Sequence, residues 1–263
     1  MDMAAQPTPL IRSDNNGVTT LTLNRPNSRN ALSIDLISAL QTELNAIGKN
    51  REISTVVISA NGPAFCSGHD LKEIRENENR KAYKLLFTEC SELMIKITQL
   101  PQPVIARVHG PASAAGCQLV ATCDLAVASY NSTFATPGVN IGLFCSTPMV
   151  ALSRNIGQKQ AMEMLLLGDS IDATTAQRFG LVNKTCSENE LDAIVNEWCN
   201  IISSKSQLTI KIGKIAFYNQ LNLPLQQAYD YAANVMVENM LAGDALEGID
   251  AFLEKRKPIW RGK

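Results

Sequence analysis

The sequence has few of the residues that metal sites and disulfide frameworks need. Only two histidines occur in 263 residues, and the seven cysteines are an odd number without any CxxC pair. Zinc sites combine such residues at short spacings, and disulfide-rich domains use even sets of cysteines. We therefore expect neither a metal site nor disulfides, and predict that most of the thiols are small, buried apolar residues.

Long apolar runs and an excess of basic charge are also missing. A membrane helix needs about 20 consecutive apolar residues, and no window of this sequence approaches that length. The 24 basic residues are scattered among 25 acidic ones, which leaves a formal charge of -1. A nucleic-acid-binding surface needs clustered positive charge. We expect neither a membrane partner nor a nucleic-acid partner.

The first twelve residues, MDMAAQPTPLIR, lack the features of a targeting segment. They contain neither a basic stretch followed by an apolar one nor an Arg-rich amphipathic helix. We predict a flexible N-terminus over residues 1–12 and a cytoplasmic location. The chain is 45% hydrophobic and only 19% charged, which is typical of a compact domain with a substantial core.

Apolar runs and helical periodicities alternate through the first half of the chain. Residues 17–23, 53–59, 103–108 and 125–128 are expected to be strands, and residues 33–49 and 79–100 to be helices. This alternation predicts an α/β core with crossover connections. After Pro148 the periodicity is almost entirely helical. We predict a core over residues 13–200 and a helical region over residues 201–263.

Two glycine-containing turns follow buried strands and are the strongest candidates for a binding site. They are AFCSGHDLKE (64–73) and VHGPASAAGCQ (108–118). Small residues let the backbone approach a ligand, and the helix after each turn begins with unpaired N–H groups. Two such amides aimed at one point form an oxyanion hole. Glycines also make plain strand-to-helix turns, so either turn alone does not decide between the two interpretations.

Six ordered blocks carry a resemblance that covers nearly the whole chain. They are NRPNSRNAL (24–32), AFCSGHDLKE (64–73), PVIARVHGPASAAGCQLVATCDLAVAS (103–129), FATPGVNIGL (134–143), GLV (180–182) and EGIDAFLEKRKPIW (247–260). In this order they resemble the enoyl-CoA hydratase/isomerase (crotonase) superfamily. The resemblance implies an α/β, crotonase-like spiral of ββα units with a C-terminal helical trimerisation region. It also implies homotrimers, or hexamers made of two trimers.

The resemblance further implies a lyase or isomerase of fatty acid metabolism that binds an acyl-CoA thioester and stabilises its enolate. Coenzyme A is then part of the substrate, and no cofactor is bound permanently. Matched position by position, the backbone amides of His69 and Ala115 form the oxyanion hole. The substrate-binding positions are Arg29, Ala64, Ser67, Asp70, Leu71 and Lys72, with Phe252 and Lys255 reaching a neighbouring subunit's adenine.

The sequence departs from the family at the two positions where a hydratase has glutamates. Those glutamates activate water and transfer the α-proton, and here the positions hold Gln118 and Gly138. An amide can orient a water molecule or a carbonyl group, but it does not accept a proton near neutral pH. Ordinary hydratase activity is therefore not expected. Asp124, which the family also has, is interpreted as structural.

Other side chains are candidates for the missing chemistry. Ser146 falls where related dehalogenases have an attacking aspartate, and Cys145 next to it is a candidate nucleophile. The ring of His69 is a candidate acid or base. Glu89 and Glu92 fall on the helix that lines the acyl pocket in relatives, although both are also typical of a solvated helix face.

Three alternative functions stay open. A Clp-type serine peptidase would use Ser113 as its nucleophile, but no histidine lies downstream of it to act as the base. A catalytically reduced protein would bind acyl-CoA without turning it over. A different CoA-thioester enzyme, such as an isomerase, thioesterase or decarboxylase, would use the same enolate stabilisation.

Overall fold

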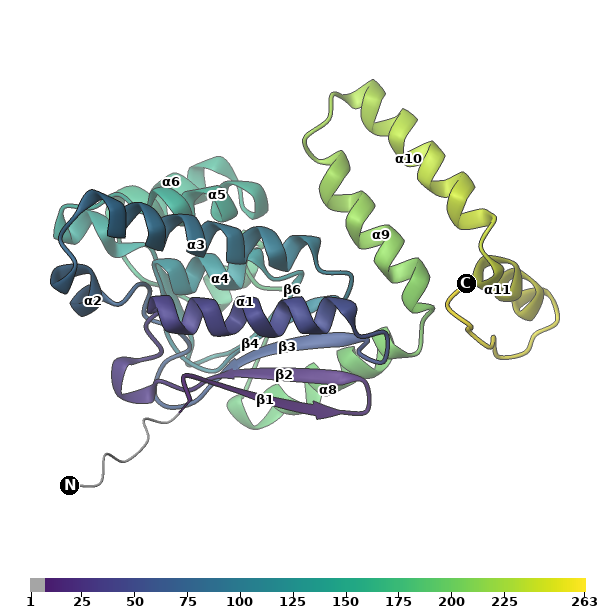
Figure 1. The fold of residues 1–263 in the computed structure, drawn as a ribbon, viewed down its shortest axis with the longest axis horizontal. Helices are drawn as coiled ribbons and strands as arrows, with labels where there is room; N and C mark the ends of the chain where they lie inside the picture. The colour runs from purple at the N-terminus through teal and green to yellow at the C-terminus, as the bar shows by residue number, and fades with distance from the viewer. Residues whose placement is uncertain (1–7) are drawn as a thin grey trace.

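A six-stranded sheet lies at the centre of the computed structural model, which describes residues 8–263. Its strand order is β1-β2-β3-β4-β6-β9; β1 and β2 are antiparallel, and the other neighbours are parallel. The strands are β1 (Leu10–Asn15), β2 (Val18–Leu23), β3 (Thr55–Ala60), β4 (Val104–Val108), β6 (Leu125–Ser129) and β9 (Lys184–Cys186). Figure 1 shows helices on both faces of this sheet, so the expected α/β core is confirmed.

Each face of the sheet has its own apolar core. On one face, α1 (Ile34–Lys49), α3 (Arg80–Gln99) and α4 (Ala115–Thr122) share the larger cluster with alternate strand residues such as Val56 and Ile58. On the other face, α8 (Glu188–Ser203) packs on Val57 and Ile105. Because both faces are covered, every residue of β3 is buried.

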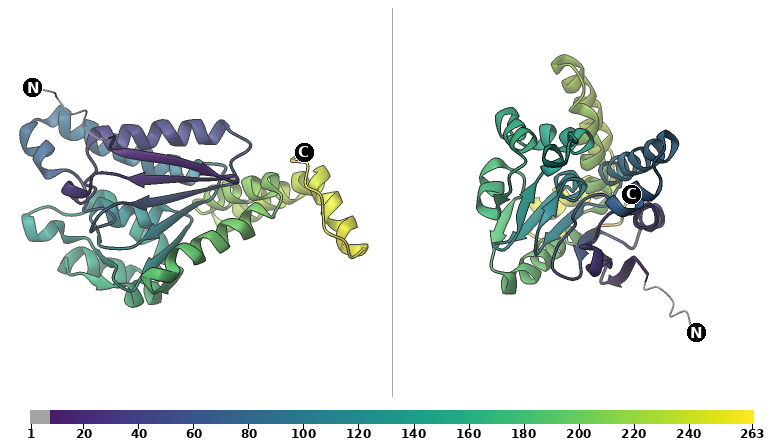
Figure 2. Two further views of the ribbon diagram at one scale, coloured as in Figure 1. Left: turned by 90° about the horizontal axis from the view of Figure 1, so that it is seen from below. Right: turned by 90° about the vertical axis from the view of Figure 1, so that its left-hand side faces the viewer.

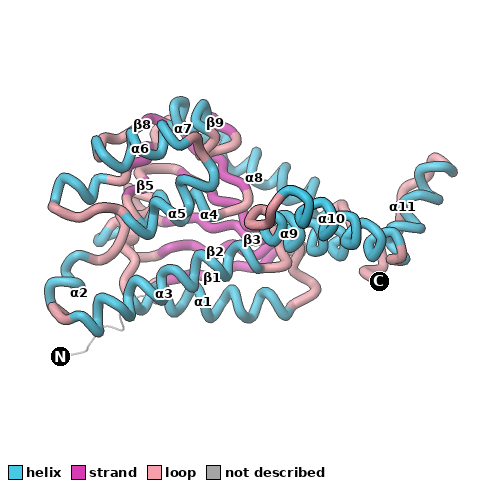
Figure 3. The backbone as a smooth tube through the Cα atoms, turned by 90° about the horizontal axis from the view of Figure 1, so that it is seen from above, coloured by secondary structure: helices cyan, strands magenta, loops and turns pink. Residues whose placement is uncertain are grey.

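A second, three-stranded sheet lies beyond the carboxyl ends of the central strands. It has the order β5-β7-β8 and consists of β5 (Ala112–Ser113), β7 (Thr133–Ala135) and β8 (Ile171–Asp172). Around it lie α5 (Ser146–Asn155), α6 (Gln158–Leu167) and α7 (Ala173–Phe179), as the tube in Figure 3 shows, and η2 (Pro137–Ile141) follows β7. Since β5 ends two residues before α4, this small sheet fixes where α4 begins.

The last three helices form an arm that extends from the body of the molecule. The helices are α9 (Gln207–Gln220), α10 (Leu225–Met240) and α11 (Gly243–Leu253), and α9 and α10 pack against each other. Figure 2 shows the arm pointing away from the sheet. Large apolar side chains on it are open to solvent; Leu225 is 75% exposed and Phe252 82%. Within residues 8–263, none of the helices combines the length and the apolar character needed to cross a bilayer.

The bounds expected for the four strands and two helices of the first half agree with the structure to within a few residues, but the expectation for the N-terminus does not. Residues 1–7 of the expected flexible segment 1–12 lie outside the described residues. The rest of that prediction is wrong, because β1 begins at Leu10 and pairs with β2 from Leu10↔Leu23 onward. The short polar strand has no apolar alternation that its sequence would reveal, and its partner supplies the hydrogen bonds.

Candidate active site

The turn that contains His69 is held at one edge by the segment before α1. The amide of Leu32 donates to the carbonyl of Gly68 at 2.7 Å, and the amide of Asp70 donates to the carbonyl of Leu32 at 3.2 Å. These bonds form a parallel bridge in which the neighbours of His69 are paired with Leu32. The amide of His69 itself therefore faces the opposite edge of the turn.

The start of α4 packs against Gly68 in the same turn. A methyl group built on Gly68 would lie 3.5 Å from the amide nitrogen of Ala115 and 2.9 Å from the Cβ of Ala114. A methyl group built on Gly116 would lie 2.1 Å from the carbonyl oxygen of Cys66. The two turns thus pack backbone to backbone through two glycines. Ala115 is the first residue of α4, where an amide has no partner within its own helix.

Ala114 turns the chain into α4 with an unusual backbone conformation. Its φ is 49° and its ψ is -116°, a region that residues other than glycine rarely adopt. Its amide donates to the carbonyl of Ala135 at 2.9 Å, which ties the turn to β7. Strain of this kind costs on the order of 1–3 kcal/mol and is concentrated at functional sites. The conformation aims the start of α4 at the His69 turn.

Gln118 lies one turn further along α4, on the same face as Ala115. It is 3% exposed, and no donor among residues 8–263 reaches its Oε1. Helical side chains lean toward the N-terminus of their helix, so this amide leans toward the turn that begins at Ala114. A buried acceptor without a partner is costly, and such atoms occur where a ligand completes the hydrogen bonding.

Gly138 has no room for any side chain. A methyl group built there would lie 2.6 Å from the carbonyl oxygen of Leu143 and 2.9 Å from the Sγ of Cys145. The segment that follows η2 folds back over Gly138, with the amide of Leu143 donating to the carbonyl of Gly138 at 2.9 Å. The position at which the resemblance implies a second hydratase glutamate is therefore closed by this chain's own backbone and by one thiol.

The two candidate nucleophiles beside this segment are not activated. Burial raises the pKa of the Cys145 thiol, which favours the neutral form, while a hydrogen bond from the Gly138 amide opposes this effect. Ser146 is exposed, and its hydroxyl donates to the carbonyl of Phe144 at 3.3 Å. Neither contact is with a base that would remove a proton.

The ring of His69 is neutral at physiological pH. Burial lowers its pKa to about 4, its Nε2 has no partner among residues 8–263, and Phe87 of α3 meets the ring edge-on at 5.3 Å between centroids. Phe87 was not singled out from the sequence, and its helical spacing gave no signal that distinguishes it from a core residue.

Asp70 organises the start of α2 (Leu71–Glu76). It caps the amides of Lys72 and Glu73, and its other oxygen accepts from Arg25 at 2.8 Å. Burial is the largest single effect and favours the neutral carboxyl, but the hydrogen bond and charge of Arg25 together with the amides of Glu73 and Lys72 outweigh it and lower the pKa of Asp70. Arg25 is a further site residue that sequence reasoning missed; its place in the NRPN turn was the available signal.

The remaining substrate-binding candidates fall into two groups. Arg29, Ser67, Leu71 and Lys72 are exposed beside the His69 turn, where the amide of Ser67 donates to the carbonyl of Arg29 at 3.0 Å; Ala64 is buried beneath them. Phe252 belongs to α11 and Lys255 follows it, and Figure 2 shows the yellow α11 end of the arm far from the body of the molecule.

The structure also places the alternative carboxylates, Glu89 and Glu92, and the alternative nucleophile, Ser113. Glu89 accepts from Gln41 of α1 at 3.2 Å, and Glu92 lines an outer groove between α1 and α3. Ser113 is on β5, whereas the ring of His109 binds the carbonyl of Gly62 at 2.7 Å. Among residues 8–263, neither histidine ring makes a hydrogen bond with Ser113, so the structure gives the peptidase hypothesis no base.

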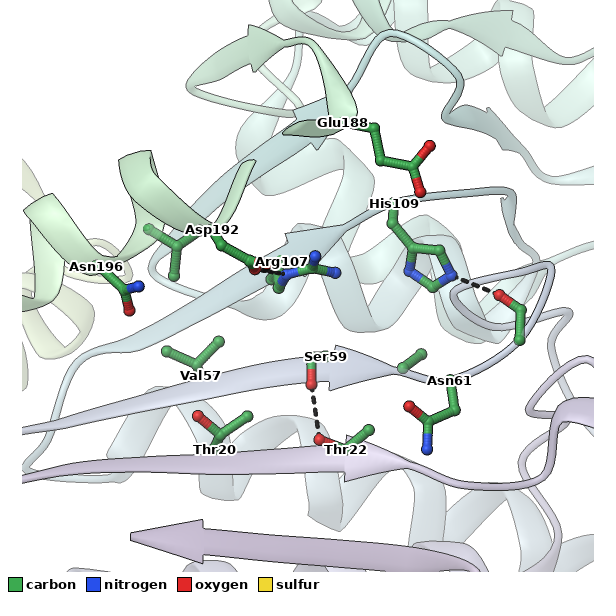
Figure 4. Close-up of a pocket in the computed structure, with 13 residues that line it drawn as sticks. Thr20, Thr22, Val57, Ser59, Asn61, Arg107, His109, Glu188, Asp192 and Asn196 are labelled. Atoms are coloured by element: carbon green, nitrogen blue, oxygen red, sulfur yellow. Dashed lines mark hydrogen bonds and ion pairs between the residues drawn. The ribbon is translucent and has the colours of Figure 1, made fainter. Parts of the chain in front are cut away.

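His109 belongs to a separate polar cleft of about 420 Å³ on the α8 face of the sheet. Figure 4 shows it between β2, β3, β4 and α8, with the guanidinium group of Arg107 and the ring of His109 side by side. Ala115 and Cys117 belong to the core on the other face. The cleft is therefore not part of the candidate active site.

The fold and the paired turns define a crotonase-type protein, and comparison with known proteins confirms this. The family model described as Enoyl-CoA hydratase/isomerase matches residues 13–263. The chain belongs to the enoyl-CoA hydratase/isomerase family.

Among its relatives are proteins of one subgroup. Enoyl-CoA hydratase domain-containing protein 3, mitochondrial, of Mus musculus is 46% identical over 244 residues, which are 93% of this chain and 81% of that protein. Its Homo sapiens counterpart is 45% identical over 256 residues, or 97% of this chain and 84% of that protein. The chain is therefore similar to members of this subgroup over nearly its whole length.

Solved structures agree. The human enoyl Coenzyme A hydratase domain-containing protein 3 superposes with a TM-score of 0.93 at 45% identity, covering 96% of this chain and 100% of that one. An enoyl-CoA hydratase of Mycobacterium smegmatis gives a TM-score of 0.94 at 47% identity, covering 96% and 98%. The prediction of a crotonase fold is confirmed.

The expected cytoplasmic location is wrong on this comparison. The relatives of the subgroup in mouse, rat, human and zebrafish are all named mitochondrial. The prediction depended on the composition of twelve residues and on reduced thiols. Neither property separates one reducing compartment from another.

Proposed function

We propose that this chain acts on an acyl-CoA thioester and stabilises its enolate with the backbone amides of His69 and Ala115. The observation that carries the proposal is the packing of Gly68 against the start of α4, with a built Cβ 3.5 Å from the Ala115 nitrogen. Thioester α-protons are weakly acidic, and removing one donor from a comparable site costs about 3–4 kcal/mol of transition-state stabilisation. Coenzyme A enters as part of the substrate.

The usual two-glutamate hydration is not part of this function. Gln118 cannot act as a base, and the backbone over Gly138 leaves no place for a carboxylate. A lyase or isomerase reaction of fatty acid metabolism that needs only the enolate fits the site better. The same two positions favour the second candidate, an acyl-CoA-binding protein with reduced catalysis.

The arm supports assembly into homotrimers or pairs of trimers. Phe252 and Leu253 at its end are 82% and 72% exposed, and Lys255 follows them with a positive φ of 55°. Apolar side chains this open are typical of subunit interfaces. In such an assembly Phe252 and Lys255 would reach a neighbour's adenine, which explains their distance from the other binding residues. Analytical ultracentrifugation tests the subunit number.

Exchange of the acyl α-protons with deuterated water tests the enolate step. A panel of saturated acyl-CoAs is incubated with the protein and followed by proton NMR. Exchange above the buffer rate is expected, with deuteroxide from the solvent removing the proton while the two amides stabilise the enolate, and Ala115→Pro, which deletes one donor, should slow it about 10²–10³-fold. Ala115→Gly keeps the amide and is the matched control. Binding without exchange would favour the second candidate, and neither binding nor exchange would reject both.

A further inference from the structure

We propose that this site decarboxylates a malonyl-type thioester, an acyl-CoA whose α-carbon also carries a carboxylate. The inference rests on the proposed function, because it uses the same two amides to stabilise the enolate. What selects the substrate class is the absence of a group positioned to remove a proton beside those amides in the described part of the chain. The electron pair of the enolate is then supplied by a substrate bond that breaks without a base, the bond between the α-carbon and a carboxylate carbon.

The side chains around the two amides are neutral. Gln118 presents an amide, Gly138 presents nothing, and Cys117 is buried with its thiol pKa raised to about 12 by desolvation. Burial also keeps the His69 ring uncharged and its Nε2 out of contact with solvent. Hydration, double-bond isomerisation and thioester hydrolysis each need a base for water or for the α-proton. Gln118, Gly138 and the Cys117 thiol are unsuited to that task, and the His69 ring, with its pKa lowered to about 4, is only a weak base.

The nearby carboxylates are engaged elsewhere. Both oxygens of Asp70 are used, one for the Arg25 guanidinium and one for the start of α2. Glu73 accepts from the amide of Ile34 at 3.0 Å, and Glu89 is bonded to Gln41. Moving any of them into the site would break a contact that holds the binding turn or α1 in place.

Decarboxylation supplies the enolate without a base. The bond between the α-carbon and the carboxylate carbon breaks, CO₂ leaves, and the electron pair of that bond passes into the thioester, whose oxygen becomes the anion bound by the two amides. Water then protonates the α-carbon, and the hydroxide left behind combines with CO₂ as bicarbonate. The product is an acyl-CoA one carbon shorter, and nothing is oxidised or reduced.

Gln118 is suited to a substrate that brings its own negative charge. An amide N–H can donate to a carboxylate, whereas a glutamate at this position would repel it. A carboxylate held among neutral groups loses much of its hydration, which raises the free energy of the bound substrate. In the transition state the charge moves toward the two amides, so the loss of hydration costs less there. Gln118, which cannot act as the base of a hydratase, can therefore bind next to an anionic acyl group.

The test compares malonyl-CoA and methylmalonyl-CoA with succinyl-CoA in deuterated water. The first two carry the carboxylate on the α-carbon and should release CO₂ and leave one solvent deuterium there; succinyl-CoA, whose carboxylate is one carbon further away, should stay intact. Gln118→Glu should slow CO₂ release at least tenfold and speed α-proton exchange of propionyl-CoA, because it adds a base and a repulsive charge. Glu92→Gln, on the outer groove, is the matched control and should match the parent chain.

The outcomes separate this inference from the proposed function. Exchange of propionyl-CoA protons without CO₂ release from either malonyl-type substrate overturns the inference and leaves the enolate site standing. Equal slowing of exchange and CO₂ release by Gln118→Glu also overturns it, since the substitution then acts only by disturbing α4. Loss of both acyl-CoA binding and exchange in the parent chain overturns the proposed function itself.

Discussion

The ammonium group of Lys214 donates a 2.6 Å hydrogen bond to the carboxylate of Asp124, 90 positions earlier in the chain. Lys214 lies on α9 with only 6% of its side chain exposed, and Asp124 comes directly before β6. The same ammonium group also donates to the carbonyls of Ile97 and Gln102, and Tyr218 donates to Asp124 at 2.9 Å. This network joins the arm to the body of the molecule.

Breaking the network from the acidic side should destabilise the protein strongly. Asp124→Asn leaves the buried ammonium group of Lys214 without its counter-charge, and such changes cost about 3–5 kcal/mol. Tyr218→Phe removes one hydrogen bond to the same carboxylate and should cost about 1.5–3 kcal/mol. Urea unfolding measures both values. If Asp124→Asn costs no more than Tyr218→Phe, the ion pair is not what holds α9 in place.

Asp124 also illustrates what the sequence could predict. The four strands and two long helices expected in the first half agree with β2, β3, β4, β6, α1 and α3 to within a few residues, because continuous apolar runs and 3.6-residue spacing are local signals. A structural role for Asp124 was expected from the family resemblance. Its partner Lys214 was not, since nothing in a run of ordinary helix residues marks one lysine as buried.

The candidate site likewise has features that the residue types predict and features that depend on how distant segments fold together. The resemblance singled out Gln118 and Gly138, and that neither of them carries a carboxylate follows from the residue types alone. That the carbonyl of Leu143 and the thiol of Cys145 close over Gly138 depends on how η2 and the segment after it fold. Short strands such as β5 and β8 were missed for a related reason: two residues contain no periodicity.

Acidification should weaken the fold through His69. Burial lowers the folded-state pKa of this ring to about 4, below the ordinary value of 6.5. The unfolded chain therefore takes up a proton at a higher pH than the folded chain does. The contribution to stability is complete above pH 6.5 and is lost as the pH falls toward 4, by at most about 3 kcal/mol.

Replacing the ring isolates this effect. His69→Phe keeps the backbone amide and an aromatic ring beside Phe87, so the difference in unfolding free energy between pH 7 and pH 4.5 should shrink relative to the parent chain. The measurement is urea unfolding at several pH values. His109→Phe, on the other face of the sheet, is the comparison. An unchanged pH dependence in His69→Phe would show that the ring titrates normally.

Restoring the two glutamates should not restore a hydratase. A side chain at position 138 must displace the Leu143 carbonyl, which a built Cβ approaches to 2.6 Å. Gly138→Ala should therefore cost about 2 kcal/mol or more, as overpacking of a buried backbone does. Gly213→Ala on α9, where a built Cβ meets nothing within 4 Å, should instead stabilise by about 0.5–1 kcal/mol. Crotonyl-CoA hydration by Gln118→Glu combined with Gly138→Glu would contradict this account of the segment.

Gly116 sets the spacing between the two turns, and its replacement should abolish enolate formation before it abolishes folding. A methyl group there would lie 2.1 Å from the carbonyl oxygen of Cys66, so Gly116→Ala must push the His69 turn away from α4. Donors in such holes act only at hydrogen-bond distance, and we expect α-proton exchange to fall at least 100-fold. The far-ultraviolet circular dichroism should stay close to that of the parent chain, because α4 itself gains a better helix former. Exchange at the parent rate in a folded Gly116→Ala protein would mean that the two turns do not act on one oxygen atom.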